Sequence, residues 1–364
     1  ISRELVTLPT LLTMRINTET LGFAKRADFY LLFLTRGLRL FAYGALPVVL
    51  VLYLSGLGFS EGRIGAVLAL TLAGDTAISL WLTRHADRLG RKNTLMLGAV
   101  LMCAGGAVFG LTGNFWIIVA AATIGVISPS GKEVGPFLSI EQAGLTQIVS
   151  NERRTSIFAW YNLTGSLASA CGALFAGYAV GTLTDSGWED VAAYRSVLVA
   201  YSAVGVLLLA VFSGLSRAIE VERVAEAAAP AGLLGLGESR GTVLRLAGLF
   251  AMDSFAGGFI IDSLMAYWFV IRFDADPKVL GGIFFGANLL AGLSSLAAAR
   301  IARRFGLINT MVFTHLPSNV LLMLVPLMPN LGAAITMLLI RCSISQMDVP
   351  TRQSYTMAVV KPEE

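Results

Sequence analysis

Charged side chains inside long apolar stretches are the residues of this chain that could carry chemistry. An ionisable group at the centre of a bilayer costs roughly 2.5–3.5 kcal/mol, so such groups must face partners or a water-filled cavity. A cation in that position can hold an anion, and a carboxylate can carry a proton between two environments. Sorted by stretch, they are Arg36 and Arg39; Lys132, Glu133 and Glu141; Asp253 and Asp262; and Arg341, Asp348 and Arg352.

Their signs suggest two roles along one polar path. Arg36, Arg39 and Tyr43 share a stripe on one helix face, so they are expected to point the same way. We expect five residues to bind an anionic group of a substrate: Arg36, Arg39, Tyr43, Lys132 and Arg341. We expect three carboxylates to carry a proton: Asp253, Glu133 and Asp348. The alternative interpretation is that these charges form structural ion pairs that hold gates.

Depth and helix geometry indicate which of the two aspartates in the seventh stretch faces a cavity. Arg39 and Asp253 each lie about ten residues into a stretch, near its middle. Asp253 and Asp262 are nine residues apart, about 180° around an α-helix, so both cannot face one cavity. We therefore favour Asp253 and expect Asp262 near the outer end. His315 is expected to be structural, and Asp75 to pair with a neighbouring helix.

Composition indicates a helical membrane protein. Hydrophobic residues make up 55% of the chain and charged residues 14%, whereas a soluble domain carries about 25% charged residues. Crossing the bilayer takes about 20 apolar residues. Ten stretches of about that length or longer are predicted as spans, at about 29–55, 63–83, 94–111, 115–149, 155–180, 195–216, 243–271, 279–299, 308–328 and 332–358.

The basic residues follow the topology of these spans. About 18 of the 27 Lys and Arg residues fall in segments on one side, which the positive-inside rule assigns to the cytoplasm. This distribution explains the net charge of +4 without a nucleic-acid partner. It also predicts an integral protein of the plasma (inner) membrane with both termini cytoplasmic.

The chain divides into two halves around a linker. Residues 1–28 form a cytoplasmic segment, 29–216 a first half, 217–242 a cytoplasmic linker, and 243–364 a second half. The fourth span is interrupted near mid-depth by Pro and Gly between 128 and 136. Such breaks are tolerated only beside protein or a water-filled cavity, and they often mark transporter binding sites. Three weak matches in the same order relate the halves, among them 39–44 with 253–258.

A short charged loop, Arg84-His85-Ala86-Asp87-Arg88-Leu89-Gly90-Arg91-Lys92, separates the second and third spans. From Ala86 onward it resembles the signature of the major facilitator superfamily. The resemblance implies an all-α bundle of two pseudo-symmetric six-helix halves, of which ten spans are present, and helices 11 and 12 would follow residue 364. The resemblance also implies a conformational role for the loop residues Asp87, Arg88, Gly90 and Arg91. Glu141, Gln142 and Arg352 lie near the cytoplasmic ends of their spans and are expected to belong to a gate, and Asp75, near the middle of the second span, is expected to have a conformational role.

These observations predict a membrane transporter rather than an enzyme. We expect alternating-access transport of a small anionic or zwitterionic solute, coupled to protons, by a monomer in the lipid bilayer. A multidrug:proton antiporter is the second hypothesis, and a sensor that keeps the fold without transport is the third. The three cysteines lack metal-ligand spacing and no phosphate-binding loop is found, so neither cofactor nor metal is expected.

Overall fold

The computed structural model describes residues 23–149, 154–220 and 240–359. Regular structure in these ranges is helical. The first group comprises α2 (Phe23–Gly56), α3 (Glu61–Leu89), α4 (Arg91–Leu111), α5 (Phe115–Ile124), α6 (Phe137–Ile148), α7 (Arg154–Asp185) and α8 (Asp190–Ser213). The second comprises α9 (Arg240–Gly257), α10 (Asp262–Phe273), α11 (Pro277–Phe305), α12 (Leu307–Leu324), α13 (Leu331–Ser345) and α14 (Asp348–Val359).

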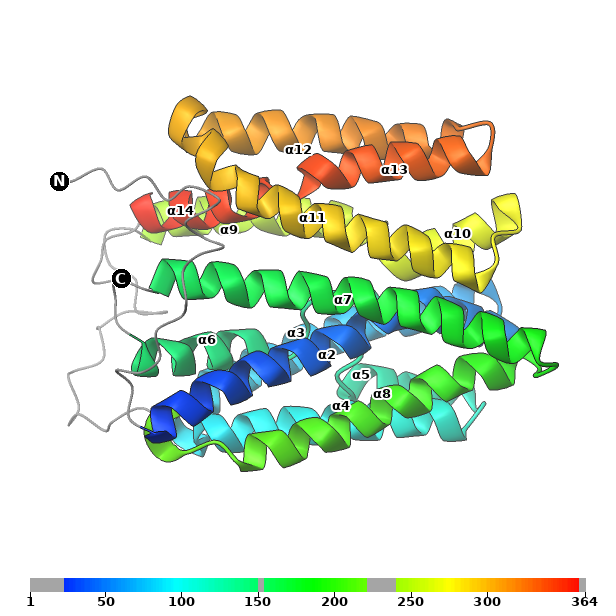
Figure 1. The fold of residues 1–364 in the computed structure, drawn as a ribbon, viewed down its shortest axis with the longest axis horizontal. Helices are drawn as coiled ribbons and strands as arrows, with labels where there is room; N and C mark the ends of the chain where they lie inside the picture. The colour runs from blue at the N-terminus through cyan, green and yellow to red at the C-terminus, as the bar shows by residue number, and fades with distance from the viewer. Residues whose placement is uncertain (1–22, 150–153, 221–239, 360–364) are drawn as a thin grey trace.

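The helices run along one long axis, with α2–α8 in one bundle and α9–α14 beside it (Figure 1). We call the end that carries residues 84–92 the loop end, and the opposite end the far end. Within the described ranges, eight helices are long and apolar enough to cross a membrane. The chain is thus an all-helical polytopic membrane protein, as its composition predicts.

Broken helices are more frequent than the sequence predicted. The fourth span is broken as expected, between α5 and α6. The seventh and tenth spans, predicted as continuous, are also broken, at 258–261 and 346–347. Adjacent glycines at 257 and 258 weaken the first of these helices, and Pro350 cannot donate the helical bond to Gln346 that would join α13 to α14. The first span already begins at Phe23 rather than near residue 29.

Apolar contacts join the two bundles at the far end. A buried cluster combines Val48 of α2 and Ala176 of α7 with Phe269 of α10 and Phe284 of α11. At the loop end the situation differs, because α9 has no buried residue. The two bundles are therefore packed together at the far end, while α9 at the loop end stays exposed.

Small residues let α2 and α7 approach closely. A Cβ atom at Gly172 would lie 1.9 Å from the carbonyl oxygen of Phe41, and one at Gly44 would lie 2.1 Å from that of Ser169. Apolar side chains gain little by leaving lipid, so membrane helices associate through such close packing. A side chain at either glycine would therefore clash with the backbone of the neighbouring helix.

We predict that Gly172→Ala destabilises the protein by about 1–3 kcal/mol, the usual cost of overpacking. Thermal unfolding of the purified variant measures the change. The control is Gly282→Ala on α11, where an added Cβ meets no atom within 4 Å. Equal stability of the two variants would contradict the close α2–α7 contact.

Candidate functional site

A pocket lies where three broken helices meet. Lys132 comes from the break between α5 and α6, Asp262 is the first residue of α10, and Arg341 lies near the end of α13. The space between the lining residues is about 580 Å³ when the solvent-open part is counted with it. Its other walls come from α10, α11, α12 and α13, including Met265, Phe284, Leu322, Cys342 and Ser345.

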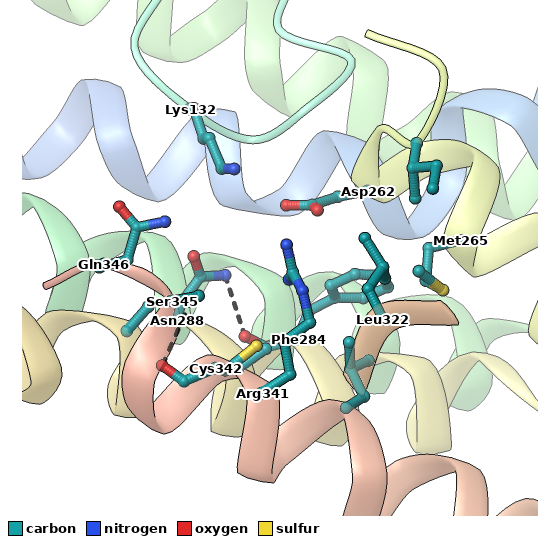
Figure 2. Close-up of a pocket in the computed structure, with 14 residues that line it drawn as sticks. Lys132, Asp262, Met265, Phe284, Asn288, Leu322, Arg341, Cys342, Ser345 and Gln346 are labelled. Carbon is teal, nitrogen blue, oxygen red and sulfur yellow. Dashed lines mark hydrogen bonds between the residues drawn. The ribbon is translucent and has the colours of Figure 1, made fainter. Parts of the chain in front are cut away.

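The charged groups of this pocket point toward one another. Figure 2 shows the Asp262 carboxylate between the ends of Lys132 and Arg341, and it interacts electrostatically with both. Within the described chain, none of the three forms an ion pair shorter than 4 Å. Asn288 donates through Nδ2 to the Phe284 carbonyl at 2.9 Å, which leaves its own carbonyl oxygen available as an acceptor. The pocket carries two cations and one carboxylate, an arrangement suited to an anionic or zwitterionic ligand.

The break that supplies Lys132 is held by side chains of the surrounding helices. Asp75 accepts the Gly135 backbone N–H at 2.6 Å, and the Tyr201 hydroxyl donates to the Val126 carbonyl at 2.5 Å. Gly131 and Gly135 adopt positive φ angles of 64° and 76°, which glycine tolerates without strain. Asp75 was predicted to pair with a neighbouring helix. It contacts the backbone of the break between α5 and α6 and not a charged side chain.

Four charged residues of the first bundle pair with one another and do not line the pocket: Arg36, Arg39, Glu133 and Glu141. Arg39 is fully buried and bonds bidentately to Glu141, at 2.7 and 2.6 Å. Its Nε lies 2.9 Å from Glu133, which Arg36 also pairs with. The Tyr161 hydroxyl donates to Glu141 as well. Two cations and two carboxylates make this cluster neutral.

Of the five residues predicted to bind substrate, the structure brings only Lys132 and Arg341 together in the pocket. Arg36 and Arg39 lie in the neutral cluster, and buried Tyr43 donates its hydroxyl to the Val134 carbonyl at 3.3 Å. Glu141, predicted to belong to a gate, is wholly buried in the same cluster.

The two aspartates of the seventh span are placed differently from the expectation. Asp262, expected near the outer end, lies in the pocket, whereas Asp253 contacts residues of α12 and α14. The prediction assumed one continuous helix, and the break at 258–261 removes the fixed angle between the two side chains.

A third charged cluster lies in the second bundle. His315 of α12 is 3.1 Å from an Asp253 oxygen through Nε2 and 3.2 Å from an Asp348 oxygen through Nδ1. Arg352 lies 3.2 Å from the other Asp253 oxygen. We predicted a structural role for His315. It is the one histidine inside an apolar stretch, and that position was the signal in the sequence that pointed to a functional role.

The charged loop of residues 84–92 is hydrogen-bonded to residues 219 and 220 at the loop end of the first bundle. Arg91 donates through Nε to Asp87 at 3.1 Å and through Nη1 to the Ile219 carbonyl at 3.1 Å. Glu220 accepts the backbone N–H groups of Arg91 and Lys92, at 2.7 and 3.1 Å, and so caps the first turn of α4. Gly90 has φ +90° between α3 and α4. Glu220 was not predicted, because only the fold brings the linker to this helix.

A polytopic bundle with broken helices around a central charged pocket defines a membrane transporter of the alternating-access type. Residues 32–364 match the Major Facilitator Superfamily, and the chain belongs to this family. It is therefore a secondary transporter and not an enzyme.

Several proteins are similar to it. An uncharacterized membrane protein of Saccharomyces cerevisiae, YJR124C, is 31% identical over 366 residues, covering 93% of this chain and 82% of the yeast protein. A bacterial homolog of the human lysosomal transporter Spinster, inward-facing and unoccupied, superposes with a TM-score of 0.70 at 16% identity, covering 94% of this chain and 77% of the homolog. The nucleoside transporter NupG gives a TM-score of 0.66 at 15% identity, covering 92% of this chain and 83% of NupG. At these identities the two structures show the shared fold alone.

We predict that Arg39→Met destabilises the protein by about 3–5 kcal/mol, because it leaves the buried Glu141 carboxylate without its cation. Denaturant unfolding of the purified variant measures the loss. Adding Glu141→Gln removes the uncompensated charge and should recover part of it. Arg63→Met, an exposed arginine on α3, is the control. Wild-type stability of Arg39→Met would refute the structural role.

Proposed function

We propose that this transporter moves a small anionic or zwitterionic solute, held at the pocket of Lys132, Asp262 and Arg341, and couples the movement to protons. The observation that carries the proposal is the excess of positive charge where three broken helices meet. Neither cation has a carboxylate within ion-pairing distance in the described chain, so both are available to a ligand.

The pocket suits a ligand with two kinds of polar group. Lys132 and Arg341 attract a carboxylate or phosphate, and the guanidinium can bind it in a planar, bidentate way. Asp262 can accept an ammonium group of a zwitterion. Phe284 and Leu322 provide apolar walls for a compact carbon skeleton. Half-helix ends near mid-membrane are the usual site of substrate contacts in transporters.

The packing of the two bundles supports a state that opens toward the loop end. Apolar contacts close the far end, while α9 has no buried residue. Since the loop of residues 84–92 is strongly basic, we assign the loop end to the cytoplasm of a plasma (inner) membrane protein. Access would then alternate when the apolar far-end contacts separate and the loop end closes.

Proton coupling is supported most by the second bundle. Asp253 and Asp348, two of the three predicted proton carriers, both contact His315. Glu133, the third, pairs with both Arg36 and Arg39 inside the neutral cluster of the first bundle. Proton exchange is therefore assigned to the aspartates in preference to Glu133.

A ligand panel tests the substrate class. The purified protein in lipid nanodiscs is heated with inorganic phosphate, small mono- and dicarboxylates, amino acids, or tetraphenylphosphonium as a lipophilic cation. An anion or zwitterion should stabilise the folded state, by about 2.7 kcal/mol at a hundred times its dissociation constant. Arg341→Gln should abolish this stabilisation, and Asp262→Asn should weaken it for zwitterions. The controls are two exposed positions on or after α10, Arg272→Gln and Asp274→Asn.

Other outcomes distinguish the remaining functions. Stabilisation by tetraphenylphosphonium and by no anion or zwitterion would favour a multidrug:proton antiporter and contradict the proposal. Binding without accumulation, in proteoliposomes with an imposed pH gradient, would indicate a sensor that keeps the fold.

A further inference from the structure

His315 lies between two carboxylates of different helices. Its Nε2 is 3.1 Å from Asp253 of α9, and its Nδ1 is 3.2 Å from Asp348, the first residue of α14. Each ring nitrogen therefore lies within ion-pairing distance of a carboxylate oxygen, which can only accept when the carboxyl group is ionised. The pocket is lined by other residues, so this cluster is separate from the proposed substrate site.

The two contacts need a proton. A neutral imidazole donates from one nitrogen and accepts at the other, so its unprotonated nitrogen would face carboxylate lone pairs. A protonated imidazole carries an N–H on both nitrogens and a positive charge, which compensates the two nearby aspartates. We infer that Asp253, His315 and Asp348 form a proton-binding site, with the proton held on the imidazole ring in this conformation. The inference deepens the proposed proton coupling and rests on it for its role in transport.

The charge balance agrees with this assignment. Arg352 of α14 pairs with Asp253, and its guanidinium lies 5.2 Å from the centre of the Phe250 ring. Besides α14, α12 packs against α11 and α13. Among the described charged residues of those two helices, none forms an ion pair with the three members of the site, and Arg341 of α13 lines the pocket instead. Two cations and two carboxylates are neutral only while His315 is protonated, and an uncompensated charge is costly in a membrane.

The site is connected to the pocket through two helix breaks. Asp253 and the pocket residue Asp262 lie on α9 and α10, on either side of the break at 258–261. Asp348 begins α14 just after the break at 346–347, and α13 before that break carries Arg341. A solute that draws Asp262 and Arg341 together can therefore shift both carboxylates relative to His315. Separation of Asp253 from Asp348 would release the proton.

Nitrogen-15 NMR of histidine-labelled protein tests the inference directly. The chain has two histidines, and His85→Gln leaves His315 as the sole reporter. In ligand-free protein in nanodiscs at pH 7, we expect both ring nitrogens to show imidazolium chemical shifts, and alkaline titration to remove one proton. The double variant Asp253→Asn with Asp348→Asn should shift the ring to a neutral tautomer at pH 7. Asp274→Asn, an exposed aspartate, should leave the spectrum unchanged.

A neutral His315 ring at pH 7 in the His85→Gln protein would overturn the inference. An imidazolium that persists in the double aspartate variant would overturn it as well. Should that variant not fold, the spectrum of His85→Gln alone decides. Because no solute is present, a failed ligand panel leaves this result intact, and a neutral ring leaves the proposed substrate pocket intact.

Discussion

Lipid offers no hydrogen-bond partner to the peptide backbone, and this constraint governs where the helices of the transporter can break. The break between α5 and α6 survives because Asp75, Tyr201 and Ser263 bond its backbone groups. Ser263 donates to the Pro129 carbonyl from the second bundle, so the break also fixes one bundle against the other. The irregular backbone that results brings Lys132 to the pocket.

The three charged clusters differ in how far their charges are compensated, and this difference suggests a different role for each. In the first bundle, Arg39 and Glu141 are fully buried and bond bidentately, so movement of either would leave a charge unpaired. In the pocket, cations exceed carboxylates and lack close partners, which favours a ligand of opposite charge. In the second bundle, Asp253 and His315 are partly exposed, with side-chain exposures of 40% and 36%.

The sequence predicted the class of fold well and the site only in part. Hydropathy, the loop of residues 84–92 and the Pro-Gly break of the fourth span identified the family and one element of the pocket. Residue types alone could not distinguish Arg39, whose donors are used internally, from Arg341, whose guanidinium is available. Partner choice depends on long-range contacts, such as the bidentate bond that joins Arg39 of α2 to Glu141 of α6. A charged cluster around His315 was not predicted, because its two partners lie on other helices, 62 residues before it and 33 after it.

The positions of the breaks explain how a substrate site and a proton site can act together while sharing no residue. Residues 258–261 join α9 to α10, and Ser263 bonds the start of α10 to Pro129. In the proposed mechanism, a shift of Asp262 on solute binding changes the angle between these two half-helices and moves Asp253 relative to His315. The same holds across 346–347 for Arg341 and Asp348. In the proposed mechanism, solute binding acts on α10 and α13, and their partner half-helices carry Asp253 and Asp348 of the inferred proton site. The coupling free energy would then depend on how differently those half-helices pack in the two access states.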